Sequence, residues 1–105
     1  MGQKGAKHTN DAQLSTDLAI EKLSSIEGIT SKKMFGGHGI FHEGKMFGLV
    51  DPKGNISLKV DEVLEKEYLS LGCTKHGKMP YYSVPKNIFH SDEFIQWAKK
   101  SIAIK

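Results

Sequence analysis

Arginine is absent from this sequence of 105 residues, because all 15 residues counted as lysine or arginine are lysines. They outnumber 12 acidic residues and give a net charge of +3. A guanidinium group can form two parallel hydrogen bonds with a guanine edge or a phosphate, whereas a lysine ammonium group acts as a point charge. Arginine-based reading of DNA bases is therefore excluded, whereas lysine can still attract a polyanion or an acidic protein as a point charge.

The chain is also poor in cysteine and lacks long apolar runs. Its single cysteine, Cys73, excludes an internal disulfide and is typical of a reducing compartment. No stretch has the pattern of a signal peptide or of a membrane-spanning helix. A length of 105 residues allows one compact domain. We therefore expect a single-domain cytoplasmic protein that does not interact with membranes.

Histidine and cysteine spacings predict neither a metal site nor a nucleophile. His38 and His42 are four residues apart in a predicted strand, which separates them by about 13 Å, too far to share an ion. Cys73 and His76 have the spacing of one ligand pair, but no second pair is recognisable. A catalytic Cys73 would need a contacting base and an oxyanion site, and the sequence indicates neither. We expect no metal, no cofactor and no enzymatic activity.

Hydrophobic periodicity and turn residues predict an α+β domain with the element order α-β-β-β-α-β-β-α. The polar residues 1–9 are predicted to form a mobile arm, and residues 10–105 to form the domain. Short connections between strands indicate antiparallel pairing, in a three-stranded meander and a separate short hairpin, with the helices on one face. The predicted elements are a helix over residues 10–27, strands at Ser31–Glu43, Lys45–Asp51 and Asn55–Val60, a helix over residues 61–71, a hairpin of Cys73–His76 with Lys78–Val84, and a helix from Ser91.

Polar residues before the three helices predict their starts. Asn10, Asp61 and Ser91 are the expected N-caps, since their side chains can accept hydrogen bonds from the first free backbone N–H groups. In the second helix, apolar residues at helical spacing predict a buried stripe of Val63, Leu64, Tyr68 and Leu71. Pro80 restricts its strand to a sheet edge or a bulge.

The segment Lys32–Phe41 has the most unusual composition, with Gly36, Gly37 and Gly39 beside two lysines. A phosphate-binding loop would open into a helix, but a strand follows here, so that interpretation is disfavoured. Instead, the glycine pair is predicted to bend one long strand through a bulge or a positive φ. Gly39 is predicted to allow another chain segment to approach closely.

Charge and aromatic residues concentrate in the predicted strand regions. Residues 31–59 and 72–90 each carry +3, whereas the helical residues 11–30 and 60–71 each carry −3. If the strand regions adjoin, the sheet has a positive side that attracts polyanions or an acidic protein. Aromatic residues beside the lysines could stack single-stranded bases, although a small core needs large side chains too. The residues to which these two alternatives apply are Phe35, Phe41, Tyr81 and Tyr82.

Three motifs in chain order carry a family resemblance. The glycine-rich strands of Met34–Phe41, Gly44–Val50 and Ser57–Val60, then Met79–Pro85, then Phe94–Ile102, resemble the N-terminal domain of the TfoX (Sxy) regulators of bacterial competence. This resemblance implies a domain similar to secretion chaperones and a role in transcription of DNA-uptake genes beside a cyclic-AMP receptor protein. It brings no catalytic residues. Family regulators continue into a helical C-terminal domain, so the sequence is expected to be a stand-alone N-terminal domain.

These observations predict a non-enzymatic regulatory interaction module that acts through a protein partner, such as a transcription factor or a polymerase component. The alternative is a nucleic-acid-binding domain with a sheet face of lysines and aromatic residues, whose binding is weak and sequence-tolerant. A small sheet with an exposed edge also predicts a homodimer. The predicted contact residues are Lys32, Lys33, Met34, Phe35, Gly36, Gly37, Gly39, Lys78, Tyr81 and Tyr82.

Overall fold

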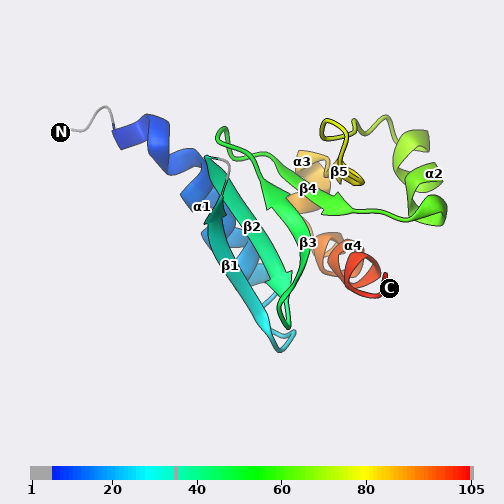
Figure 1. Ribbon diagram of the computed structural model, residues 1–105, viewed down its shortest axis with the longest axis horizontal. Helices are drawn as coiled ribbons and strands as arrows, with labels where there is room; N and C mark the ends of the chain where they lie inside the picture. The colour runs from blue at the N-terminus through cyan, green and yellow to red at the C-terminus, as the bar shows by residue number, and fades with distance from the viewer. Residues whose placement is uncertain (1–5, 35, 105) are drawn as a thin grey trace.

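The computed structural model describes residues 6–34 and 36–104, which form one antiparallel sheet and surrounding helices (Figure 1). The five strands lie in the order β1-β2-β3-β4-β5. This arrangement confirms the predicted α+β class with a single domain. The elements are α1 (Ala6–Lys22), β1 (Ile29–Met34), β2 (Gly37–His42), β3 (Lys45–Val50), β4 (Ile56–Lys59), α2 (Glu62–Ser70), β5 (Tyr81–Ser83), α3 (Lys86–Phe89) and α4 (Glu93–Ile102).

The segment predicted as one long strand, Ser31–Glu43, is a hairpin, so that prediction is wrong. β1 and β2 pair antiparallel, with Met34 opposite Gly37 at the turn and Ile29 opposite His42 at the far end. Gly36 has a φ of 78°, a left-handed conformation that a tight hairpin turn requires and that glycine adopts without strain. The glycine pair therefore reverses the chain instead of bending it.

The predicted short hairpin is also different, because its two parts do not form a separate sheet. Tyr81, Tyr82 and Ser83 pair with β4 and extend the same sheet, which gives the observed order of four strands, α2 and then β5. Cys73–His76 contributes a single bridge, between Lys75 and Tyr82. β5 is the last strand of the sheet, in agreement with the position predicted for a strand that follows Pro80.

The first helix begins before its predicted cap. α1 starts at Ala6, so Asn10 lies inside the helix and is not its N-cap. Ala6 and Lys7 both have favourable helix propensities, which allows the helix to extend toward the N-terminus. Of the predicted mobile arm, residues 6–9 belong to α1, and residues 1–5 lie outside the described part of the chain.

The second helix confirms its predicted cap but only part of its buried stripe. The backbone N–H of Leu64 donates to the Asp61 carboxylate at 2.9 Å, as an N-cap requires. Leu64 and Tyr68 are buried, whereas Val63 is 67% exposed and Leu71 is 59% exposed. Positions 64 and 68 lie one above the other on a helix, whereas Val63 points away from that face. Leu71 is the C-cap residue that follows the last helical residue, Ser70.

The last helices differ slightly from expectation. The short α3 lies in a stretch with no predicted element, and α4 follows it directly. The Ser91 hydroxyl accepts a hydrogen bond from the Glu93 N–H at 3.2 Å, so Ser91 contributes to the start of α4 as predicted, although Asp92 is the residue that immediately precedes the helix. None of the helices in residues 6–34 and 36–104 is long and apolar enough to cross a bilayer.

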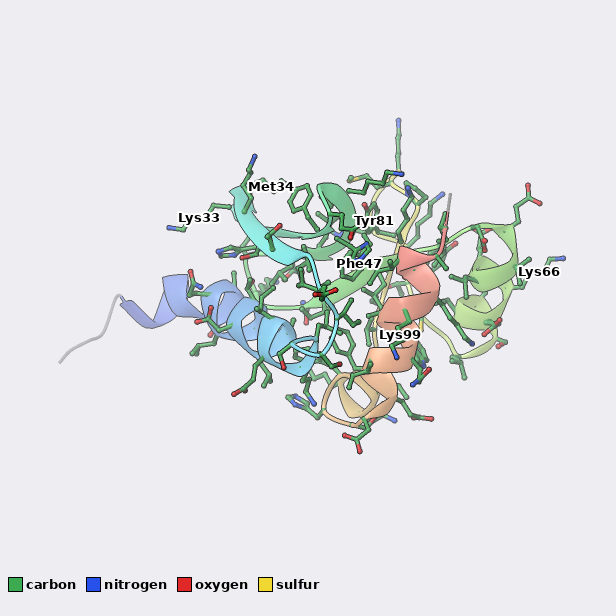
Figure 2. All side chains as sticks on the ribbon, turned by 90° about the horizontal axis from the view of Figure 1, so that it is seen from below. Lys33, Met34, Phe47, Lys66, Tyr81 and Lys99 are labelled. Atoms are coloured by element: carbon green, nitrogen blue, oxygen red, sulfur yellow. The ribbon has the colours of Figure 1, made fainter. Side chains whose placement is uncertain are left out.

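The core lies between the sheet and two helices. α1 packs on β1, β2 and β3, and α4 packs on β3 and β4, both on the same side of the sheet (Figure 2). Ile40 and Leu58 project from the sheet into this core and are fully buried beside Leu23 and Phe94. The opposite side of the sheet therefore carries no helix in the described residues.

Candidate protein-binding surface

Strand register defines a sheet face that α1 and α4 do not cover, here called the open face. Paired residues share a face, so Lys32, Gly39 and Leu49 lie together across β1, β2 and β3. Figure 2 shows Met34 and Tyr81 on the side of the sheet away from α1 and α4. The open face includes Thr30, Lys32, Met34, Gly39, Phe41, Met46, Leu49, Ser57, Lys59, Tyr81 and Ser83.

Leu49 and Tyr81 form the floor of the open face and are only 5% and 4% exposed. Both lie outside the main core cluster and are buried nevertheless. The Tyr81 hydroxyl donates to the Met46 carbonyl at 3.3 Å, which fixes the tyrosine ring against β3. Burial also raises the pKa of Tyr81, so its hydroxyl remains protonated at neutral pH.

Two methionine side chains cover Gly39 in the middle of the open face. A Cβ atom at Gly39 would lie 2.9 Å from the Sδ atoms of both Met34 and Met46. The close approach predicted at Gly39 is therefore confirmed, and the approaching groups are two thioethers. Unbranched, polarisable methionine side chains can repack against differently shaped partners. Together with half-buried Phe41, they form an adaptable apolar surface.

Lysines lie at both ends of this apolar surface. Lys32 is on β1, two residues from Met34 on the same face, and Lys59 is on β4 opposite Tyr81. In the described residues, the one salt bridge joins Lys100 to Glu67 on the α4 and α2 helices. Lys32 and Lys59 thus have no carboxylate within 4.0 Å there, and both charges are available to an acidic partner.

The described strands all lie within residues 21–104, which match the family model of the TfoX N-terminal domain. This chain belongs to the TfoX N-terminal domain family. No curated protein matches its sequence. The family match confirms the resemblance predicted from the three sequence motifs, and it covers nearly the whole chain.

The TfoX N-terminal fold brings four of the predicted contact residues together on the open face: Lys32, Met34, Gly39 and Tyr81. Lys33 is on the same strand but points to the opposite side, because it pairs with His38. Lys78 is exposed in the turn before β5. Phe35 lies outside the described residues.

The remaining predicted contact residues contribute to the turn, the strand packing and the core of the domain. Gly36 forms the β1–β2 turn, and a Cβ atom at Gly37 would overlap the Val50 carbonyl oxygen. Tyr82 lies in the core, because its partner in the register is Leu58, which points toward the helices. Gly37 thus permits close packing of β2 against β3, and Tyr82 contributes to the core.

The two tyrosines for which base stacking and core packing were the alternatives are both buried. The Tyr82 hydroxyl donates to the Glu65 carboxylate at 2.7 Å, and this hydrogen bond to a carboxylate raises the pKa of Tyr82. Tyr68 of α2 packs edge-on against Tyr82 and against Trp97, with ring centroids 6.1 and 4.7 Å apart. Of the aromatic residues named for stacking, Phe41 alone is half-buried on the open face among the described residues.

The thiol and imidazole groups considered for chemistry are buried separately. Cys73 is buried, and burial raises the pKa of its thiol, which keeps the weakly nucleophilic protonated form at neutral pH. His38 is buried beside β3, and its Nδ1 atom has no hydrogen-bond partner among the described residues. Within residues 6–34 and 36–104, no three His, Cys, Asp or Glu side chains are grouped to hold a metal ion.

Sequence reasoning missed Met46 and Leu49 as members of the open face. β3 is apolar on both sides, so alternation alone does not show which residues point to the core. A bulge between Ile40 and Phe41 also shifts the pairing of β2 with β3. The pairing register was therefore needed to identify these two residues.

Proposed function

We propose that this TfoX N-terminal domain is a non-enzymatic regulatory module that acts on the transcription of DNA-uptake genes by binding a protein. The partner is a transcription factor or a component of RNA polymerase. The match of residues 21–104 to the TfoX N-terminal family carries this proposal. The open face supports it, because an uncovered apolar sheet face offers a contact surface that the domain core does not use.

The composition of the open face favours a protein as the partner. Protein interfaces combine an apolar centre with a polar rim and are enriched in methionine and aromatic residues. On the open face, Met34, Met46 and Phe41 provide the centre, while Lys32 and Lys59 provide positive charge at its ends. A partner that fits this surface presents apolar side chains with acidic residues at the periphery.

The same residues give less support to nucleic-acid binding. Stacking of bases needs exposed rings, and Tyr81 and Tyr82 are both 4% exposed. With no arginine in the chain, the remaining attraction to nucleic acid comes from lysine point charges, which do not select a sequence. Protein binding is therefore the function that the open face supports best.

A complementation experiment tests this proposal. In the source organism, we expect deletion of the gene to lower transcripts of DNA-uptake genes and the intact gene to restore them. Met46→Glu places a negative charge in the middle of the open face and should reduce restoration at least about tenfold, the effect of roughly 1.4 kcal/mol of lost binding. Leu69→Glu is the matched control, because Leu69 is exposed on α2, away from the sheet.

Each outcome has a defined meaning once circular dichroism shows that both variants are folded. Unchanged transcripts on deletion would contradict the regulatory role. Full restoration by Met46→Glu would show that the open face is not the contact surface. Loss with Leu69→Glu and not with Met46→Glu would place the contact on α2.

A further inference from the structure

One edge of the sheet is paired with a neighbouring chain segment, and the other edge is unpaired in the described residues. β5 is closed by the preceding segment: the Ser83 N–H donates to the Thr74 carbonyl at 2.8 Å, and the His76 N–H donates to the Tyr81 carbonyl at 2.7 Å. Among the described residues, β1 is the outermost strand at the other edge and pairs with β2 alone (Figure 1). The backbone groups on the outer side of β1 are therefore available for pairing.

The register shows which backbone groups of β1 point outward. The Glu43 N–H donates to the Gly28 carbonyl at 2.9 Å, so the pair of residues 28 and 43 is hydrogen-bonded. Hydrogen-bonded pairs alternate along an antiparallel ladder, which directs the backbone groups of Thr30, Lys32 and Met34 toward β2. The N–H and C=O groups of Ile29, Ser31 and Lys33 consequently point away from the sheet.

α1 does not cover this edge. The four central residues of β1, from Thr30 to Lys33, are all exposed. Ser31 and Lys33 are on the sheet side that faces the helices, since they pair with Ile40 and His38, and they are exposed nevertheless. An added strand can therefore reach the outer side of β1 without displacement of a helix.

The two lysines of β1 define the charge of the strand that fits there. Lys32 points to the open face and Lys33 to the opposite side, and neither has a carboxylate within 4.0 Å in the described residues. A second copy could instead pair with β1 and form one continuous sheet, with both open faces on the same side. The two-fold axis that relates the two copies would then pass through Ser31 or Lys32. Lys32 would then lie opposite or diagonal to Lys32 of the other copy, and such like charges repel.

We propose that β1 binds an extended acidic segment of the partner protein, which adds a sixth strand to the sheet. This inference rests on the proposed function, because it specifies how the protein partner is recognised. The segment places two adjacent acidic residues opposite Lys32 and Lys33, with an apolar residue next to them opposite Met34. Backbone hydrogen bonds to Ile29, Ser31 and Lys33 hold the strand, and the lysines select its charge.

The probe is the peptide Thr-Thr-Val-Glu-Glu-Val-Thr-Thr with blocked ends, which fits β1 in either direction. A ¹⁵N NMR titration of the full chain at about 50 mM salt should show shifts in β1 and β2, with slower amide exchange at Ser31 and Lys33. Binding should weaken as salt rises, because the two charge pairs are exposed. The same peptide with Lys-Lys in the centre should not bind.

Two variants test the two parts of this recognition. Ser31→Pro removes an outward N–H and obstructs an added strand, yet it leaves the hydrogen bonds with β2 in place. The double variant Lys32→Glu and Lys33→Glu reverses the charge. Each should weaken peptide binding at least about tenfold, the effect of roughly 1.4 kcal/mol. The matched control reverses Lys66 on α2 and Lys99 on α4, which Figure 2 shows away from β1, and should bind like the parent chain.

Several results would overturn the inference. These are the absence of shifts at millimolar peptide, shifts confined to other elements, or undiminished binding by both β1 variants. Protection of β1 that depends on protein concentration without peptide would identify a second copy as the occupant. If the β1 charge-reversal variant restores transcripts while Met46→Glu does not, edge recognition fails and the proposed function stands.

Discussion

Two tyrosine hydroxyls at the α2 end of the core have opposite surroundings. Tyr68 is buried, and its hydroxyl forms no well-aligned hydrogen bond in the described residues, although the Ser101 side chain lies near it. The Tyr82 hydroxyl, in contrast, donates to Glu65 at 2.7 Å. A buried polar group without a partner lowers stability, and a hydrogen bond to a charged group raises it. The two rings are in contact, so their phenylalanine variants form a matched pair.

We predict that Tyr68→Phe leaves the free energy of unfolding unchanged or raises it by up to about 1 kcal/mol, because it removes an unsatisfied hydroxyl. Tyr82→Phe should lower it by about 1–3 kcal/mol, since it leaves a part-buried carboxylate without its donor. Urea denaturation of both variants measures the difference. Equal losses of stability would contradict the hydrogen-bond assignment.

Alkaline pH should destabilise the domain through Tyr68. Burial raises the pKa of Tyr68 above its ordinary value of 10.0, so above that pH the unfolded chain releases a proton that the folded chain keeps. The free energy of unfolding is therefore predicted to fall as pH rises above 10.0, by up to about 1.4 kcal/mol per pH unit for this group. Tyr68→Phe should show a shallower fall in denaturation measured between neutral pH and pH 11.

At the scale of elements, the junction of β2 and β3 depends on Gly37. A Cβ atom there would overlap the Val50 carbonyl oxygen, and backbone atoms cannot move aside as a flexible side chain can. We predict that Gly37→Ala lowers the free energy of unfolding by about 3 kcal/mol or prevents folding. Gly44→Ala is the control, because its φ of 86° costs about 1–2 kcal/mol but its Cβ would meet no atom within 4 Å.

Thermal unfolding of the two glycine variants gives the comparison. A Gly37→Ala variant as stable as Gly44→Ala would contradict the close approach of β2 to Val50.

Elements with strong local signals were predictable from the sequence. Asp61 and the residues after it define α2, and the apolar run from Lys45 defines β3, because each signal lies within a few neighbouring residues. The β1–β2 hairpin was missed because glycines at a turn and glycines at a bulge look alike in sequence. The short α3 has no side-chain cap to mark its start.

The candidate site was predictable only in part, because strand pairing between residues distant in sequence decides which side chains share a face. The lysines, methionine and glycine of the Lys32–Gly39 segment were identified by their unusual composition, and the structure places Lys32, Met34 and Gly39 on one face. Tyr82 and Tyr81 are adjacent in sequence, yet one is in the core and the other is on the open face. Which one faces the core depends on pairing with β4, a contact distant in sequence.

At the scale of the whole molecule, the charge of +3 comes from lysines alone. Attraction to nucleic acid should therefore be electrostatic, and we predict that two DNA duplexes of unrelated sequence bind with affinities within about twofold of each other. Binding should weaken steeply between about 50 and 200 mM salt. Fluorescence anisotropy measures both effects. Strong preference for one sequence at physiological salt would contradict this account.

Site-specific photo-crosslinking in living cells tests the central claim most directly, namely that the open face binds a protein of the transcription machinery. A photoreactive residue is placed at Met46 on the open face or, as a control, at exposed Leu69 on α2. The account predicts a crosslink from position 46 to a transcription factor or polymerase subunit, lost when Lys32 and Lys33 are reversed in charge, and no such crosslink from position 69. The same subunit crosslinked from position 69 and not from position 46 would contradict it.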